Sequence, residues 1–207
     1  MPIQDRPIQF DSLREALSLA YLKEHHGLEK ERAEIIPKVI LIHHTVIPSL
    51  DATFEAFDPP LLPSSRAEII QSSALNVSAH FGVDQDGTIY RFLPETSFAR
   101  HVIGLNYCAI GVENVGGGPD LPLTQAQLAA NISLVFYLKK KFPDIEYLIG
   151  HHEYQAFFKH PLWKESDPNY LTKKNDPGPK FMEGIRKELK ALKLKGPPDE
   201  KSMSNSE

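Results

Sequence analysis

Hydrophobic positions recur at helical spacing in three parts of the chain. In residues 11–25 the apolar side chains fall on one stripe, which predicts an amphipathic helix. A second helix begins at Thr124, because Gln127 stands three residues later and completes a capping box. A third stripe lies among the lysines and arginines of residues 180–195, whose charges are expected on the solvent face of a terminal helix.

Other segments have the patterns of strands. Residues 38–45 form a short apolar, β-branched run, typical of a strand that is buried on both faces. Residues 78–92 alternate on either side of an Asp-Gly turn and predict a hairpin. Residues 108–115 and 146–150 predict two more strands. Helices that alternate with strands, together with one hairpin, predict an α/β fold: a single domain with a central mixed β-sheet flanked by helices.

Two segments are less regular. Residues 46–65 contain four prolines and no clear period, so a long loop is expected there. Residues 66–74 are expected to form a short helix. The prediction is therefore a compact α/β unit with one long connection in its first half.

Composition narrows the class of protein. A hydrophobic fraction of 41% and a charged fraction of 24% are those of a soluble globular protein, and no apolar run is long enough for a membrane span. The net charge of −4 gives no bias toward nucleic acid. The single Cys108 excludes an intrachain disulfide. The acidic N-terminal segment does not have the pattern of a secretory signal. If a leader was removed, the protein is expected in the cell envelope, in the periplasm or outside the cell; otherwise it is expected in the cytoplasm.

Several common active-site motifs are absent. His152-Glu153 is not the helical zinc motif, because that motif needs a second histidine where Ala156 stands. The glycines of residues 116–118 lack the Lys-Ser/Thr of a phosphate loop, and no Gly-x-Ser-x-Gly elbow occurs. Cys108 opens an apolar strand, which is typical of a small core residue rather than a nucleophile.

Two pairs of adjacent histidines stand at the ends of predicted strands. Neighbouring residues in a strand point to opposite faces, so at most one of His43 and His44, and one of His151 and His152, is expected to face a shared site. A catalytic zinc commonly has three protein ligands, and two histidines with Asp176 of "KKNDPG" would supply them. The alternative is that these are polar residues that end strands and form an Asn-Asp-Pro-Gly turn.

Six motifs follow one another along the chain: "IHHT", "NVSAHFGVDQDGTIY", "AIGVENVG", "LTQAQ", "GHHE" and "KKNDPGP". In this order they resemble the type 2 N-acetylmuramoyl-L-alanine amidases. This family includes the anhydro-muropeptide amidases and phage lysozyme-type amidases, and is related to the peptidoglycan recognition proteins. The resemblance runs from about Val39 to Phe181, and we expect a zinc amidase domain in residues 36–195. Residues 1–35, which the resemblance does not cover, are expected to form an N-terminal helical extension, and the composition of residues 196–207 predicts a disordered tail.

The resemblance also implies the site residues. By position in the motifs, zinc is bound by His43, His151 and Asp176, and the catalytic glutamate is Glu113. The scissile amide joins the lactyl group of N-acetylmuramic acid to L-alanine in peptidoglycan or muropeptides. Glu113 is expected to take a proton from the zinc-activated water and deliver it to the departing nitrogen, while Lys174 and zinc stabilise the oxyanion.

Further polar residues are assigned less specific roles. Ala109, Gly111 and Glu113 share one face of a strand, where the small residues are expected to leave room for a substrate. His80 and His101 are expected to contact substrate or orient a ligand, with a structural role as the alternative. Asn114 is a candidate substrate contact or a cap. The remaining histidines are expected on reverse faces (His44, His152) or at the surface (His25, His26, His160).

One segment departs from the family pattern. The segment 153–173, between the second histidine pair and Asp176, is longer than its counterpart in the family. It contains a second Asp-Pro, so Asp167 is a competing candidate for the third ligand. Asp176 matches the motif better, because a lysine precedes it by two residues and a glycine follows its proline. The aromatic side chains of this insertion form a wall of the cleft or pack on the N-terminal helix.

The expected partners are peptidoglycan or muropeptide fragments, with zinc as cofactor, no nucleic acid, no membrane span and a monomeric state. Two alternatives stay open: a non-catalytic peptidoglycan-binding module and a zinc peptidase that acts on another amide. Loss of a metal ligand would mark the first, and substrate profiling would separate the second. The sequence leaves open whether the muramic acid is anhydro or intact, and whether sacculus or soluble fragments are cut.

Overall fold

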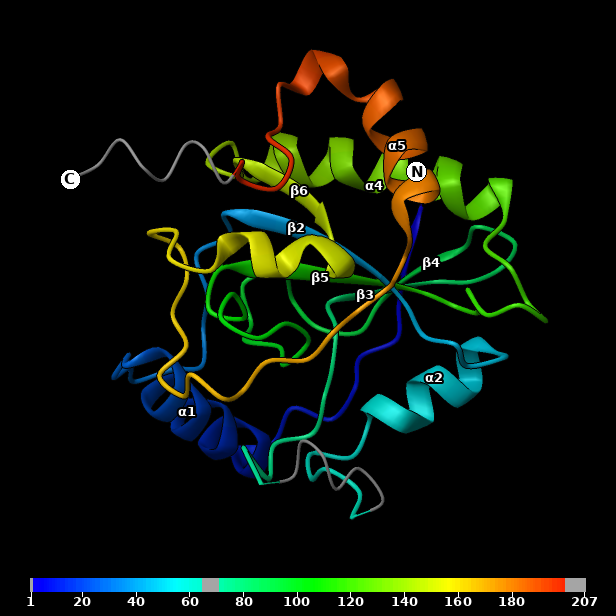
Figure 1. Cartoon of the computed structure of the whole chain (residues 1–207). Helices are drawn as coiled ribbons and strands as arrows, with labels where there is room; N and C mark the ends of the chain where they lie inside the picture. The colour runs from blue at the N-terminus through cyan, green and yellow to red at the C-terminus, as the bar shows by residue number, and fades with distance from the viewer. Residues whose placement is uncertain (1, 65–70, 200–207) are drawn as a thin grey trace.

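A six-stranded mixed sheet crosses the protein, in a computed structural model that describes residues 2–64 and 71–199. The strand order is β1-β4-β3-β5-β2-β6 (Figure 1). Among the described strand pairs only β3–β4 is antiparallel, so the predicted hairpin and the mixed sheet are both confirmed. The strands are β1 (Ile3–Asp5), β2 (Val39–His44), β3 (Phe81–Val83), β4 (Ile89–Arg91), β5 (Ala109–Asn114) and β6 (Tyr147–Gly150).

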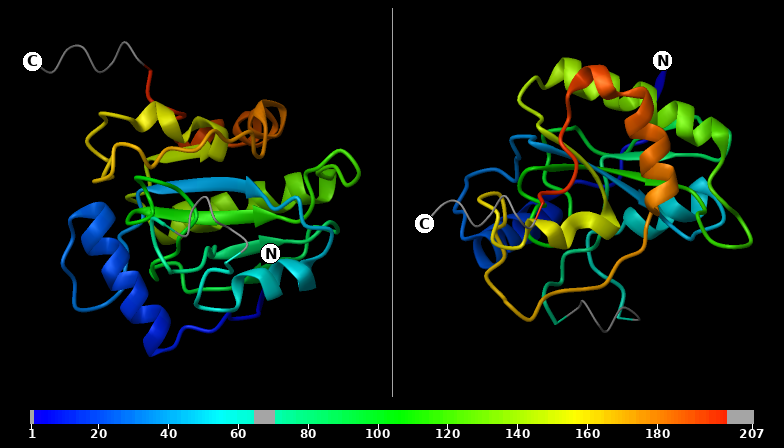
Figure 2. Two further views of the ribbon diagram at one scale, coloured as in Figure 1. Left: turned by 60° about the horizontal axis from the view of Figure 1, so that its bottom comes forward. Right: turned by 45° about the horizontal axis from the view of Figure 1, so that its top comes forward.

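Helices cover both faces of this sheet. α4 and α5 lie on one face, and α1 and α2 lie on the other (Figures 1 and 2). The bounds are α1 (Ser12–His26), α2 (Leu50–Phe57), α4 (Gln125–Lys141) and α5 (Pro179–Glu188), with 3₁₀ turns η1 (His151–Phe157) and η2 (Lys190–Leu192). Within the described residues, no helix is both long and apolar enough to cross a membrane.

The centre of the sheet is apolar on both faces. The four residues from Val39 to Ile42 in β2 have no exposed surface, which agrees with the β-branched run in the sequence. β2 lies between β5 and β6, and all three run parallel. The capping box predicted at Thr124 and Gln127 is present at the start of α4. The core therefore fixes the relative positions of β2, β5 and β6, which carry the residues of interest.

The N-terminal segment packs on the same sheet and core. β1 adds an edge strand beside β4, and α1 places Tyr21 and Leu22 in the main hydrophobic core. The guanidinium of Arg14, which is 1% exposed, donates to the backbone carbonyls of residues 57, 58 and 59 at the end of α2. α1 and α2 are thereby joined through buried hydrogen bonds.

The prediction of a long loop over residues 46–65 is wrong in part, because helix α2 lies within this segment. Ser49 caps this helix by accepting from the N–H of Ala52, and Leu50, Thr53 and Phe57 form its buried face. The prolines of the segment lie outside Leu50–Phe57 and therefore flank the helix rather than interrupt it. The short helix predicted for residues 66–74 falls largely outside the described residues, and so does most of the predicted disordered tail.

Two histidines expected at the surface are buried. His25 is 6% exposed and His26 is 4% exposed, because the segment 164–170 packs over the end of α1. The Nδ1 atom of His25 lies 2.8 Å from Oε1 of Glu165, and the ring of Tyr170 contacts His25. The surface prediction failed here because the covering residues are far away in the sequence. His160 is half-buried against Tyr147 and Phe157.

Candidate metal centre and active site

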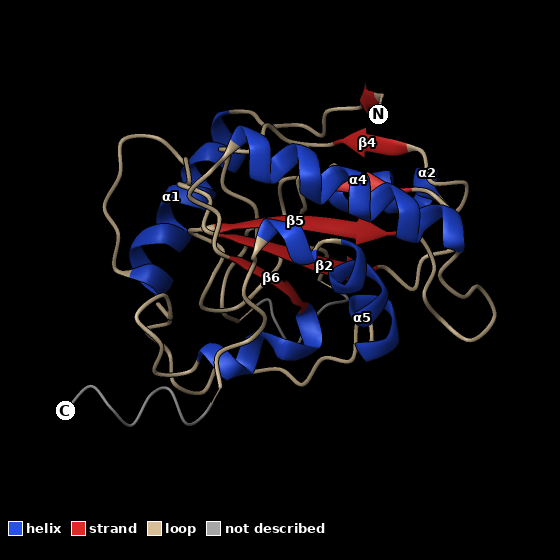
Figure 3. Cartoon of the chain, turned by 90° about the horizontal axis from the view of Figure 1, so that it is seen from above, coloured by secondary structure: helices blue, strands red, loops and turns tan. Residues whose placement is uncertain are grey.

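The carboxyl ends of β2, β5 and β6 meet at one edge of the sheet (Figure 3). In the register of these strands His43 pairs with Glu113, and Ile42 pairs with Gly150, so His151 follows directly at the same edge. Ligands of open α/β sheets bind outside the carboxyl ends of parallel strands. The topology therefore brings together His43 and His151, which are 108 residues apart in the sequence, with Glu113 between them in the chain.

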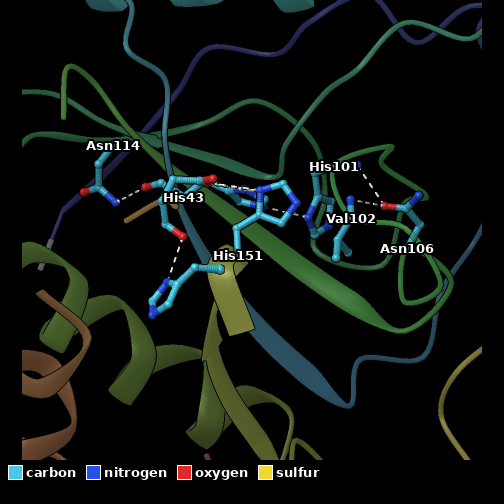
Figure 4. Close-up of polar contacts among 8 residues, drawn as sticks. His43, His101, Val102, Asn106, Asn114 and His151 are labelled. Atoms are coloured by element: carbon cyan, nitrogen blue, oxygen red, sulfur yellow. Dashed lines mark hydrogen bonds and ion pairs between the residues drawn. The ribbon is translucent and has the colours of Figure 1, made fainter. Parts of the chain in front are cut away.

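Three side chains converge at this edge. The Nδ1 atoms of His43 and His151 lie 3.0 Å apart, and Oδ2 of Asp176 lies 3.2 Å from the first and 3.1 Å from the second. All three residues are buried, and one ligand atom from each lies within 4.8 Å of the others. His43 and His151 face each other across this point in Figure 4. Asp176, rather than Asp167, thus completes the cluster that the sequence predicted.

The donor set fits a divalent cation. Ligand atoms at about 2.0–2.2 Å from a tetrahedral zinc lie roughly 3.3–3.5 Å from one another, close to the separations found here. Burial lowers the pKa of His151 to about 4, so its ring is neutral near pH 7. Burial alone would raise the pKa of Asp176, but its hydrogen bond with His151 holds that pKa well below the usual range. A neutral imidazole and an ionised carboxylate are the protonation states that bind a metal.

Asp176, the third candidate ligand, is held by His152, which follows the candidate ligand His151 in the chain. The backbone N–H of His152 donates to the carbonyl oxygen of Asp176 at 2.8 Å, and Nδ1 of the same residue lies 3.0 Å from that oxygen. His152 is thus outside the cluster, as predicted, but its ring contacts the Asp176 backbone. Asp167 is exposed, and its Oδ1 accepts from the N–H of Asn169 in a local turn.

A cavity of about 210 Å³ opens beside the cluster. Glu113 lines it, because the residue is the register partner of His43 and projects from the same face. Lys174, which is exposed, lines the cavity from the segment that leads into Asp176. The structure therefore brings together the three candidate ligands, the candidate glutamate and the candidate lysine around one space.

The position of His44 differs from the one expected from the sequence. His44 was expected on the reverse face of β2, yet it is among the residues that line the cavity. Its ring lies against Gly117, where an added Cβ would stand 2.2 Å from the ring carbon Cγ. The glycine, with φ of 89°, lets the loop after β5 approach this ring.

His80 and Asn114 are not among the residues that line the cavity. His80 has no exposed surface; its Nδ1 accepts from the N–H of Gly111, and its Nε2 donates to the carbonyl of Ser97. Asn114 is also fully buried and donates to the carbonyl of His43. Both side chains support the backbone of the site. For His80 this is the structural alternative named from the sequence, whereas Asn114, expected as a substrate contact or a cap, links β5 to β2.

His101 does line the cavity, and it occupies space that was assigned to substrate. Its ring lies on Gly111, where an added Cβ would be 2.8 Å from the ring carbon Cγ. The small residue in β5 therefore makes room for a histidine side chain. The Nδ1 atom of His101 lies 3.0 Å from Nε2 of His43 (Figure 4).

Two residues that hydrogen-bond to the segments around the site were not predicted from the sequence. Nδ2 of Asn131 in α4 donates to Oδ1 of Asn114, and Nδ2 of Asn114 donates to the His43 carbonyl. The hydroxyl of Tyr154 accepts from the N–H of Thr172 at 2.9 Å and so contacts the irregular segment that leads to Lys174. The only sequence signal was position: Asn131 lies on the apolar stripe of a helix, and Tyr154 follows His151 by three residues.

The aromatic insertion packs on the N-terminal helix, one of the two roles considered for it. Tyr170 contacts His25, and Ser166 hydrogen-bonds to the carbonyl of His25 through its N–H and its hydroxyl. Trp163 stacks on Tyr154 at 6.1 Å between ring centroids. The segment from 163 to 170 therefore joins α1 to the side of the site.

Comparison with known proteins agrees with this geometry. The family model described as N-acetylmuramoyl-L-alanine amidase matches residues 30–179, most of the chain. The chain belongs to this amidase family. An endolysin of Klebsiella phage KP32 is 33% identical over 84 residues, which are 38% of this chain and 55% of the endolysin. The chain thus spans about half the length of that curated relative.

Solved structures share the fold of this amidase family member. LysC, an N-acetylmuramoyl-L-alanine amidase from Clostridium intestinale URNW, superimposes with a TM-score of 0.57 at 22% identity, covering 94% of this chain and 99% of LysC. A selenomethionine derivative of AmpD gives a TM-score of 0.53 at 19% identity, covering 93% of this chain and 94% of AmpD. At these identities the likeness concerns the fold alone.

Proposed function

We propose that this protein is a zinc-dependent hydrolase of the amide bond between the lactyl group of N-acetylmuramic acid and L-alanine, acting on peptidoglycan or muropeptides. The observation that carries the proposal is the convergence of His43, His151 and Asp176 beside a cavity that Glu113 and Lys174 also line. A binding module that had lost catalysis would have no need to keep a complete ligand set and a glutamate at the same edge.

The three ligand residues would hold the metal through Nδ1, Nδ1 and Oδ2. When bound, zinc supplies a water of lowered pKa and polarises the amide carbonyl. Three protein ligands leave a fourth position open, which is the pattern of catalytic rather than structural zinc sites. The carboxylate and two neutral imidazoles also suit the metal electrostatically, because the set carries one negative charge against two positive charges.

Glu113 is the proposed general base and acid. Its carboxylate projects from β5 beside His43, within the cavity, where it can take a proton from water at the site. The same carboxyl group then gives that proton to the nitrogen of the departing L-alanine. Proton delivery matters because an amine anion is a very poor leaving group.

Lys174 is proposed to stabilise the charge that develops on the amide oxygen. Its ammonium group belongs to an exposed side chain at the mouth of the cavity, two residues before Asp176. A charge placed where the oxyanion forms lowers the barrier without a proton transfer of its own. Its exposure also lets the side chain adapt to a substrate that enters from solvent.

Mass spectrometry of the products tests the proposal. We expect zinc-loaded protein to convert a purified muropeptide into a free peptide that begins with L-alanine and an unmodified glycan. Parallel reactions with anhydro and intact muramic acid substrates would identify the form that is cut. An intact muropeptide, with one zinc bound per chain, would contradict the proposal and favour a binding module. Cleavage at another amide would favour a zinc peptidase.

A further inference from the structure

A row of hydrogen-bonding groups runs from the backbone of β5 to the proposed metal site. Nε2 of His101 lies 3.1 Å from the carbonyl oxygen of Ala109, and Nδ1 of His101 lies 3.0 Å from Nε2 of His43. The other nitrogen of His43, Nδ1, belongs to the ligand cluster. One histidine thus separates a fixed backbone acceptor from a candidate metal ligand. The contact between His101 and His43 is drawn in Figure 4.

The backbone acceptor decides where the hydrogens lie. A carbonyl oxygen can only accept, so the hydrogen in the contact with Ala109 must be on Nε2 of His101. In a neutral ring the Nδ1 atom of His101 then has a lone pair and accepts from Nε2–H of His43. His43 is left with its lone pair on Nδ1, the atom that points into the cluster. This is the tautomer that a metal requires.

The orientation of the His101 ring is fixed on several sides. One face lies on Gly111, and the N–H of Gly111 is held by Nδ1 of His80. The backbone N–H of His101 donates to Oδ1 of Asn106 at 2.8 Å. Rotating the ring by 180° would place carbon atoms at both hydrogen-bond positions, so the packing and the two contacts select a single orientation.

The cluster geometry is consistent with this tautomer. With a lone pair on Nδ1 of His43, that atom and Oδ2 of Asp176 are two acceptors only 3.2 Å apart. Such a contact is repulsive unless a positive charge lies between the two atoms. The hydrogen-bond chain through His101 therefore prepares His43 for a cation and leaves it poorly suited to donate to Asp176.

We propose that His101 is a positioning residue that fixes the tautomer and orientation of His43 through the carbonyl of Ala109. Of the two functional roles considered for His101, this is the orientation of a ligand rather than contact with substrate, and it now has a specific partner, His43. The inference rests on the metal site proposed above, and it assigns His101 an effect on metal affinity. Outer partners of ligating histidines typically change metal affinity by about 10–100-fold when they are removed.

Nitrogen NMR tests the tautomers directly. Long-range ¹H–¹⁵N correlation spectra of the full chain, with and without zinc, distinguish protonated from bare imidazole nitrogens. We expect the hydrogen of His101 on Nε2 and the hydrogen of His43 on Nε2 in the zinc-loaded protein. A hydrogen on Nδ1 of His101 would overturn the proposal. Because the readout needs no turnover, failure of the amidase assay with these tautomers in place would reject the proposed reaction alone.

Two variants test the consequence for metal affinity. His101→Phe keeps a ring on Gly111 but removes the acceptor, and we expect a zinc Kd about 10–100-fold weaker by competition with a chelator. His101→Asn keeps an acceptor close to the position of Nδ1 and should restore most of the affinity. His160→Phe, in a half-buried histidine that contacts Tyr147, is the matched control with unchanged Kd.

A zinc Kd of His101→Phe within twofold of the wild-type value, in a variant with a normal unfolding transition, would overturn the proposal. A variant that loses only substrate affinity, seen as a raised KM with unchanged zinc binding, would instead assign His101 to substrate contact and equally overturn it. If His101→Phe fails to fold, the NMR experiment on the wild-type protein decides the question.

Discussion

The carbonyl oxygen of Asp176 accepts two hydrogen bonds from one residue, His152, through its backbone N–H and its Nδ1. The residue that follows one proposed ligand therefore holds the backbone of another. This link joins the start of η1 to the segment before α5, two parts of the chain that reach the site from different directions. It makes the geometry of the ligand cluster depend on a histidine that binds no metal.

Replacing His152 by phenylalanine should weaken zinc binding. His152→Phe keeps the backbone hydrogen bond and a ring of similar size, but removes the Nδ1–H that steadies Asp176. We expect a loss of about tenfold in zinc affinity, as for other outer partners of metal ligands. Competition with a chelator measures it, beside His160→Phe as the control. An unchanged Kd would show that the backbone bond alone is sufficient.

Replacing Glu113 by glutamine should separate metal binding from turnover. The amide is nearly isosteric with the carboxylate but cannot accept the proton, so we expect kcat to fall by about 10²–10⁴-fold. The zinc content should stay at the wild-type level, because Glu113 is not one of the three clustered ligands. Turnover assays and metal analysis on the same sample make the measurement. Near-normal kcat with zinc bound would reject Glu113 as the base.

Lys174 and its neighbour Lys173 form a natural pair for comparison. Both are exposed, but only Lys174 is among the residues that line the cavity. Lys174→Ala should lower kcat by about 10²-fold or more, because a charge aimed at the developing oxyanion is lost. Lys173→Ala should retain wild-type kcat and controls for the loss of one positive charge in this segment. Equal effects of the two variants would indicate a general electrostatic contribution.

The stability of the fold should depend on pH through His80. Burial lowers the pKa of His80 to about 4, below the value of about 6.5 in an unfolded chain. The unfolded state therefore binds more protons between these values, so the stability is fully present above about pH 6.5 and decreases as the pH falls toward 4. The slope from one such histidine is at most about 1.4 kcal/mol per pH unit.

The variant His80→Asn isolates this contribution. Its side-chain oxygen can still accept from the N–H of Gly111, but it does not titrate between pH 4 and 7. Urea unfolding of both metal-free proteins across this range should give a shallower loss of stability in the variant. Parallel curves for the two proteins would mean that His80 titrates equally in the folded and unfolded states.

The strand ends of the site could be predicted from the sequence because apolar runs stop there. β2 and β6 are recognisable as apolar segments, so His43 and His151 could be placed at the ends of strands. The parallel pairing of β2 with β6 then brings these ends together. Asp176 lies in an irregular segment with no such period. Only its motif distinguished it from Asp167, and the structure places Asp176 in the cluster.

The role of His101 could not be predicted in this way. The position of its ring depends on Gly111 beneath it and on Asn106 beside it, and neither contact follows from hydrophobic periodicity. The same holds for His25 and His26, which look polar and exposed at the end of a helix until residues 164–170 cover them. Side-chain contacts between distant segments are set by packing rather than by local pattern.

The packing of α1 on the rest of the protein limits where the chain can be shortened. The family match begins at residue 30, but Tyr21 packs on Phe98, and Arg14 donates to three carbonyls at the end of α2. A fragment cut at residue 30 would keep every proposed catalytic group and still present an open apolar surface to water. We expect such a fragment to collect in inclusion bodies, since the limits of homology are not the limits of the folding unit.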